Sequence, residues 1–146
     1  MDKLQEQLIK HEGSKKDNSG RHIIYQDTVG KWTCGYGRNL SDVGISETEA
    51  LFLLQNDISK AKDNVNKYLP WTVNLDRIRY DVLVNMCFNL GIGGLLKFKN
   101  TLGLVKQGKY KEAAVAMLDS KWAVQVGRRA TDLAKQMETG IYYKNI

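Results

Sequence analysis

Two carboxylate residues near the start of the chain could carry acid–base chemistry. Glu12 stands in His11-Glu12-Gly13, and Asp27 follows after fourteen intervening residues, in a polar turn. Two carboxyl groups in different environments can divide this work, because one in an apolar pocket stays protonated whereas a solvated, hydrogen-bonded one stays ionised. We predict that Glu12 is the acid and Asp27 the anion.

The segment before Glu12 favours a helix. Leu4, Leu8 and Ile9 recur at helical spacing, and Gly13 predicts a helix end in a left-handed turn. Glu12 then lies in the last turn, where a carboxylate faces exposed carbonyl groups at a cost of roughly 0.3–1 kcal/mol. Taken alone, Glu12 is explained most simply as a solvated surface charge.

The segment after Glu12 favours a β-hairpin. Residues 22–25 and 32–34 are rich in β-branched and aromatic side chains, as hairpin strands are. Asp27 and Gly30 fit the first and fourth positions of a type I turn. A helix that ends in Glu, followed by a hairpin that carries Asp and Thr, indicates the wall of a cleft.

At these residues the chain resembles the phage-type lysozymes, or endolysins. The family motif is a Glu-Gly pair, an Asp or Cys, a Thr and then Gly-x-Gly. The corresponding residues here are Glu12-Gly13, Asp27, Thr33 and Gly35-Tyr36-Gly37. Further matches follow in the right order, at residues 85–91, 111–114, 120–122 and 143–145.

The resemblance runs essentially end to end and implies an α+β, lysozyme-like fold. We expect one catalytic domain over residues 1–146, mostly helical, with two lobes around an active-site cleft. The smaller N-terminal lobe, about 13–65, would hold a β-hairpin or sheet. The larger lobe, about 66–146, would be helical, with helix 1–12 packed on it.

Helical patterns dominate the chain beyond the hairpin. A capping box over residues 46–49 predicts a helix of about 20 residues that ends before Pro70. Its apolar stripe should face the core: Ala50, Leu54, Ile58, Ala61 and Val65. Asn74 would cap a central, buried helix, which Gly91 would stop. Further helices are expected at about 100–107, 110–118 and 127–138.

The chain departs from the family in the spacing between Glu12 and Asp27. Six extra residues fall within the segment from Ser14 to His22, whose composition is that of an exposed loop. Loop insertions cost little, because closure entropy grows only logarithmically with length. The insertion also holds Asp17, a second candidate for the anion. We favour Asp27, because the turn, Thr33 and the glycines all accompany it.

The resemblance implies hydrolysis of the β-1,4 bond between N-acetylmuramic acid and N-acetylglucosamine in peptidoglycan. Glu12 would protonate the glycosidic oxygen, Asp27 would stabilise the positive charge on the sugar, and Thr33 would position the attacking water. Inversion is the implied outcome, and it requires carboxyl groups roughly 6.5–9.5 Å apart, against about 5–5.5 Å for retention.

Other residues would bind substrate or support the acid. Asn89 would bond a substrate acetamido group, or alternatively cap the helix near the glycine stop. Leu40 and Phe88 would supply apolar contacts to sugar rings. The resemblance implies that Arg129 reaches Glu12, whereas the residues alone allow a surface ion pair. Arg38 stands two residues after Tyr36, where a relative has a histidine in a lobe-stabilising ion pair, so we do not expect that ion pair here.

Two other functions remain open at this point. A lytic transglycosylase cleaves the same bond with the muramyl hydroxyl as nucleophile, and would need Glu12 but not Asp27. A non-catalytic peptidoglycan-binding protein could keep the fold without turnover, although intact Glu12, Asp27 and Thr33 argue against it.

Composition adds expectations about partners and location. The net charge of +6 suits an anionic polymer surface, although solubility explains it equally. We expect neither cofactor nor metal, no nucleic-acid partner, no stable membrane insertion, and a monomer. No apolar export signal opens the chain. A free endolysin would therefore accumulate in the host cytoplasm and act in the periplasm after the membrane is permeabilised.

Overall fold

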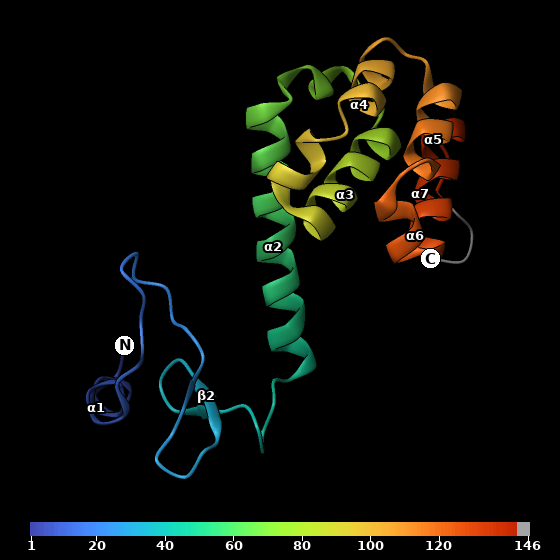
Figure 1. The fold of residues 1–146 in the computed structure, drawn as a ribbon. Helices are drawn as coiled ribbons and strands as arrows, with labels where there is room; N and C mark the ends of the chain where they lie inside the picture. Colours follow the sequence, from blue (N-terminus) through green and yellow to red (C-terminus); the bar gives the residue numbers. More distant parts are fainter. Residues whose placement is uncertain (143–146) are drawn as a thin grey trace. The chain divides into compact units, whose positions relative to one another are not determined.

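The computed structural model describes residues 1–142 and divides the chain into two compact units. The first is Met1–Phe52, and the second begins at Leu53 (Figure 1). The family match at 143–145 lies outside the described residues.

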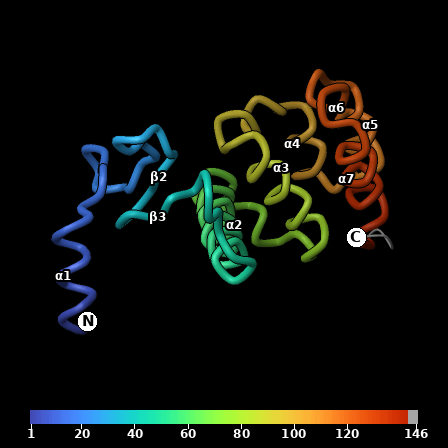
Figure 2. The backbone as a smooth tube through the Cα atoms, turned by 90° about the horizontal axis from the view of Figure 1, so that it is seen from below, coloured from blue at the N-terminus to red at the C-terminus, as the bar shows by residue number. Residues whose placement is uncertain are grey.

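The first unit consists of one helix and a three-stranded antiparallel sheet (Figure 2). Helix α1 (Lys3–Glu12) precedes β1 (Tyr25–Gln26), β2 (Trp32–Cys34) and β3 (Arg38–Asn39), which pair in the order β1-β2-β3. The predicted hairpin is confirmed, although its strands are shorter than the sequence pattern indicated. The third strand was not predicted from the sequence.

Helix α1 ends at the predicted residue. Gly13 has φ 61° and ψ −170°, and its N–H donates to the carbonyl of Ile9. This backbone region is open essentially to glycine alone, and it differs from the left-handed helical turn that we expected. This difference does not change the expectation for Glu12, because Glu12 is still in the last turn of α1.

Helix α2 (Glu47–Tyr68) begins at the predicted capping box. The Ser46 hydroxyl accepts from the Glu49 N–H at 3.2 Å, and the Glu49 carboxylate accepts from the Ser46 N–H at 2.8 Å. The predicted core-facing stripe is wrong in its first half, since only Ala61 and Val65 are buried whereas Leu54 is 42% exposed. Only the C-terminal half of α2 contributes to the core of the second unit.

The second unit is entirely helical among its described residues. Its elements are α2 from residue 53, η1 (Pro70–Asn74), α3 (Arg77–Leu96), α4 (Lys99–Lys106), α5 (Tyr110–Leu118), α6 (Lys121–Val126) and α7 (Arg128–Thr139). Helix α3 carries much of the core, as predicted from its apolar residues: Val82, Leu83, Val84, Met86 and Cys87 are all buried. No single described helix is long and apolar enough to cross a membrane.

One expectation about α3 is wrong and another is confirmed. Asn74 does not cap it, because residues 70–74 form a 3-10 turn that starts at Pro70; Asp76 is the cap, and its side chain accepts from the Arg79 N–H at 3.1 Å. The predicted stop at Gly91 is confirmed. With φ 75° and ψ 164° Gly91 breaks the helical path, and the chain then resumes helical structure as far as Leu96.

Arg79 ties three helices of this unit together. Its guanidinium donates to the carbonyls of Met137 at 2.7 Å and Glu138 at 2.9 Å, and it stacks 3.8 Å from the centre of the Tyr110 ring. A cation at the C-terminal end of a helix satisfies carbonyl groups that have no intrahelical donor. Arg79 therefore anchors the end of α7 to α3 and α5.

Candidate functional site

The carboxyl group of Glu12 lies against the backbone of the Gly-x-Gly turn. Glu12 is exposed, and a Cβ added at Gly37 would lie 3.0 Å from both its Cδ and its Oε2. Gly37 also has φ 84°, which side-chain-bearing residues rarely adopt. Glycine at position 37 thus lets the turn between β2 and β3 approach the carboxyl group closely.

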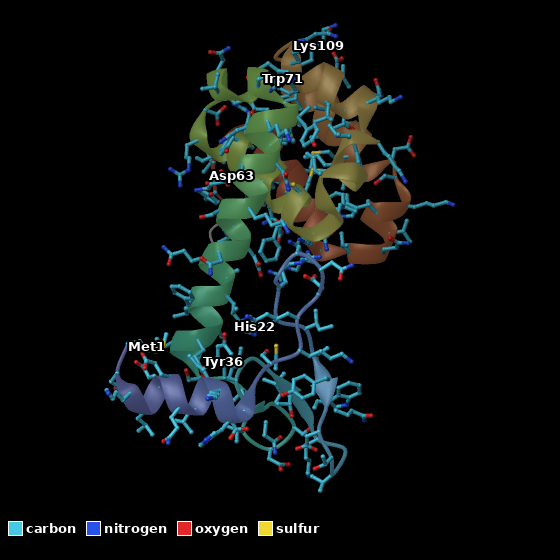
Figure 3. The ribbon with its side chains drawn as sticks, turned by 90° about the vertical axis from the view of Figure 1, so that its left-hand side faces the viewer. Met1, His22, Tyr36, Asp63, Trp71 and Lys109 are labelled. Atoms are coloured by element: carbon cyan, nitrogen blue, oxygen red, sulfur yellow. The ribbon has the colours of Figure 1, made fainter. Side chains whose placement is uncertain are left out.

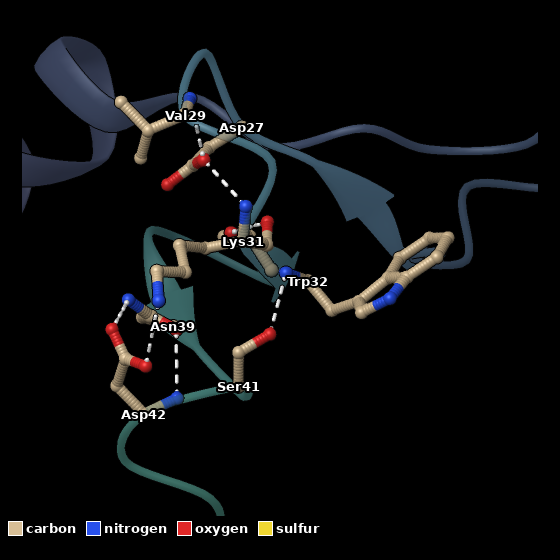
Figure 4. Close-up of polar contacts among 8 residues, drawn as sticks. Asp27, Val29, Lys31, Trp32, Asn39, Ser41 and Asp42 are labelled. Atoms are coloured by element: carbon tan, nitrogen blue, oxygen red, sulfur yellow. Dashed lines mark hydrogen bonds and ion pairs between the residues drawn. The ribbon is translucent and has the colours of Figure 1, made fainter.

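Asp27 organises the turn between β1 and β2 through one of its carboxylate oxygens (Figure 4). Its Oδ1 accepts from the N–H of Val29 at 3.0 Å and of Lys31 at 2.8 Å, and its carbonyl accepts from Gly30 at 3.1 Å. The predicted turn over 27–30 is therefore present. Oδ2 accepts no hydrogen bond from the described residues, so it is available to a ligand.

Thr33 is buried in β2, between Tyr25 of β1 and Asn39 of β3. Its hydroxyl donates to the carbonyl of Lys31 at 3.1 Å, in the same turn that holds Asp27. A hydroxyl that donates its single hydrogen still has acceptor capacity, so a water could donate to Oγ1 without breaking this bond.

Asp17 is fully engaged within the insertion. Its Oδ1 accepts from the N–H and hydroxyl of Ser19 and from the N–H of Arg21, at 2.8–3.0 Å, and its Oδ2 accepts from Arg21 Nε at 2.7 Å. The Ser19 hydroxyl, followed by the Arg21 N–H, lowers the pKa of Asp17 to about 2. Unlike Asp27, this carboxylate has no free oxygen, which favours Asp27 as the anion.

Arg38 forms an ion pair within the first unit. Its guanidinium donates to both oxygens of Glu49, at 2.8 and 2.7 Å, and to the carbonyl of Gly44 at 3.1 Å. The bonds from Arg38, and next the Ser46 N–H, hold the pKa of Glu49 at about 2. The pair ties β3 to the first turn of α2. The neighbouring Leu40 is half-buried, and its N–H donates to the carbonyl of Trp32 at 2.7 Å.

Glu49→Gln should make the stability of the folded protein vary less with pH in the acid range. Because the folded-state pKa of Glu49 is lowered from 4.5 to about 2, the ion pair stabilises fully above pH 4.5 and is lost as the pH falls through about 2. Gln retains the capping box but not the charge. We expect a lower melting temperature than wild type at neutral pH and a smaller difference near pH 2, measured by circular dichroism. A difference that does not change with pH would contradict this role.

In the second unit, Asn89 holds a buried tryptophan. Its Oδ1 accepts from Trp122 Nε1 at 2.7 Å, and the Trp122 ring meets Phe98 edge-on with centroids 5.8 Å apart. The alternative that Asn89 caps the helix near Gly91 is not supported, because its Oδ1 is engaged by Trp122 and its side chain bonds no backbone group of the described residues. Its amide nitrogen makes no hydrogen bond to the described residues, so it could donate to a substrate carbonyl.

Phe88 and Arg129 line one cavity of about 410 Å³ in the second unit, together with Asn85. Phe88 is 41% exposed, so its ring can be contacted by a ligand. Arg129 donates from Nε to Asn85 Oδ1 at 2.9 Å. Asn85 was not among the predicted site residues, although it lies in the matched segment 85–91. The predicted contact of Arg129 with Glu12 stays a prediction.

Comparison with known proteins shows which proteins this chain resembles. The model of the family described as phage lysozyme matches residues 15–139. Probable T4-type lysozyme 1 of Dictyostelium discoideum is 29% identical over 157 aligned positions, which cover 86% of this chain and 91% of the relative. An endolysin of Bacillus phage B103 is 34% identical over 73% of this chain and 40% of the relative. The pre-baseplate central spike protein Gp5 of Enterobacteria phage T4 is 26% identical over 86% of this chain and 27% of the relative.

Proposed function

This chain belongs to the phage lysozyme family and is a muramidase, and we propose that Glu12, Asp27 and Thr33 carry out its reaction. Its substrate is peptidoglycan, in which it hydrolyses the β-1,4 bond between N-acetylmuramic acid and N-acetylglucosamine. The observation that carries the residue assignment is the approach of the Gly37 backbone to the Glu12 carboxyl group. This approach brings the Glu-Gly and Gly-x-Gly parts of the motif together in space.

Glu12 serves as the general acid in this proposal. Its proton passes to the glycosidic oxygen as the bond from that oxygen to the anomeric carbon breaks. Glu12 is exposed in the first unit, so the bound glycan has to supply the desolvation that keeps the carboxyl protonated.

Asp27 and Thr33 act on the opposite side of the reaction. The free Oδ2 of Asp27 stabilises the positive charge that develops on the sugar, while its Oδ1 is held by two backbone N–H groups. Thr33 Oγ1 accepts from the attacking water, whose oxygen bonds to the anomeric carbon and whose proton passes to Asp27. This sequence inverts the anomeric configuration.

Substrate contacts in the second unit complete the proposal. The half-exposed Phe88 ring contacts a sugar face, and the free amide nitrogen of Asn89 donates to an acetamido carbonyl, while Trp122 fixes the Asn89 orientation. In the first unit, Leu40 adds an apolar contact.

Mass analysis of the products tests the reaction type. Digestion of purified peptidoglycan should release muropeptides that have each gained one water and carry a reducing end. Products with a 1,6-anhydro ring and no added water would instead identify a lytic transglycosylase. A preparation that binds peptidoglycan without releasing any product would leave the non-catalytic alternative, and would overturn the proposal.

We further propose that the protein acts as a monomeric free endolysin. It would accumulate in the host cytoplasm and reach the periplasmic peptidoglycan after another protein permeabilises the membrane. One relative is an endolysin, and another is a phage spike protein, so a virion-associated role is the alternative. Detection of the protein in purified virions would favour that alternative.

A further inference from the structure

The insertion between Glu12 and Asp27 is an ordered turn. Lys16 and His22 form an isolated antiparallel bridge, and the N–H of Ile23 donates to the carbonyl of Lys15 at 2.9 Å. The Asp17 carboxylate accepts four hydrogen bonds from Ser19 and Arg21 at the tip. The segment 14–22 therefore has a defined shape, although its composition is that of an exposed loop.

This ordered turn contacts the Gly-x-Gly segment through Tyr36. The His22 ring meets the Tyr36 ring edge-on, with centroids 5.0 Å apart and planes at 78°, and the two side chains lie close together in Figure 3. Lys16 Nζ lies 5.9 Å from the centre of the same ring. The Ser14 hydroxyl and His22 Nδ1 are 2.6 Å apart, which fixes the imidazole orientation.

Tyr36 is the residue immediately before Gly37, whose backbone lies against the Glu12 carboxyl group. Ser14, at the base of the insertion, follows Glu12 by only two residues. The insertion thus contacts Tyr36, the neighbour of Gly37. Through Ser14 it is also joined to α1, the helix that carries Glu12.

We propose that the segment 14–22 is a clamp that positions Glu12 for catalysis, with His22 as its positioning residue. His22 restricts Tyr36, Tyr36 restricts the Gly37 backbone, and Gly37 limits the positions open to the Glu12 carboxyl group. The proposal rests on the assignment of Glu12 as the acid. It gives the insertion a role in turnover that is separate from substrate binding, because His22 acts through Tyr36.

The test compares kcat and KM for soluble glycan strands between wild type, His22→Ala and His22→Phe. His22→Ala removes the ring and should lower kcat by about three- to tenfold with KM unchanged, since small misplacement of a catalytic group slows the reaction. His22→Phe keeps an aromatic edge against Tyr36 and should recover most of the lost kcat. Asn18→Ala, at the exposed tip of the same segment, is the matched control and should behave as wild type.

Any of the following outcomes would overturn the proposal that the segment 14–22 positions Glu12. Wild-type kcat in His22→Ala shows that the contact with Tyr36 does not position the acid. A raised KM with unchanged kcat shows that His22 binds substrate instead. Failure of His22→Phe to recover kcat excludes the ring contact as the cause. Equal melting temperatures ensure that folded enzymes are compared, and Ser14→Ala, which loosens the imidazole but keeps the ring, replaces His22→Ala if that variant does not fold.

Glu12→Gln, measured alongside, separates the two proposals. If Glu12→Gln is inactive and His22→Ala has the wild-type kcat, only the clamp fails. If Glu12→Gln is active, the acid assignment fails, and the clamp fails with it.

Discussion

Glu12→Gln is expected to lower the rate of peptidoglycan hydrolysis by at least about 100-fold, because an amide cannot supply the proton that the leaving oxygen needs. Gln has nearly the same size and keeps the side chain beside the Gly37 backbone. Folding and substrate binding should therefore be retained. The measurement is the clearing of permeabilised Gram-negative cell walls, followed by a pull-down assay of wall binding.

The matched control for this variant is Glu6→Gln. Glu6 is another exposed glutamate of α1, about 1.7 turns before Glu12 on the same helix. The substitution Glu6→Gln removes the same charge from α1 and should leave the rate of peptidoglycan hydrolysis unchanged. If Glu12→Gln clears walls at more than half the wild-type rate, Glu12 is not the general acid.

Asp27→Asn should cause the second large loss, of about 100-fold or more in kcat. Asn keeps the oxygen that accepts from Val29 and Lys31, so the turn and Thr33 should stay in place. What is lost is the negative charge opposite the developing positive charge, and preorganised electrostatic stabilisation of this kind contributes a large part of many enzymatic rates. Steady-state turnover of soluble glycan strands measures the loss, and melting temperatures check the fold.

Asp17→Asn is the control for Asp27→Asn. Asn at position 17 can still accept from the backbone N–H groups of Ser19 and Arg21, so the insertion should keep its turn. Turnover within about twofold of wild type is expected, since Asp17 presents no free oxygen to a substrate. An active Asp27→Asn together with an inactive Asp17→Asn would transfer the anion to Asp17. Two active variants with anhydro products would indicate a transglycosylase.

Local patterns in the sequence predicted much of the fold. The capping box at Ser46 and Glu49, the end of α1 at Gly13 and the turn at Asp27 all formed where their residues indicated. Each depends on groups a few residues apart, so it is specified by short-range backbone geometry and hydrogen bonding. The family motif added the candidate roles of the site residues. Residue spacing alone would not have assigned a catalytic role to a threonine in a strand.

Expectations that depended on contacts at longer range were less accurate. The stripe of α2 was predicted to be buried throughout, but burial depends on which elements cover it, and only Ala61 and Val65 are covered. Asn74 and Asp76 are both good caps, and the turn that starts at Pro70 decides between them. The bond between Asn89 and Trp122 joins residues far apart in the chain, so no local pattern indicates it.

The sequence by itself determined the helix that ends in Glu12, the turn that holds Asp27 and the mostly helical character of the rest, because local hydrogen bonds and apolar spacing specify these features. Only the tertiary structure brought Gly37 against the Glu12 carboxyl group and the insertion against Tyr36. The physical reason is that these contacts join separate segments, whose approach is decided by packing and hydrogen bonding of the whole unit rather than by the residues beside each one.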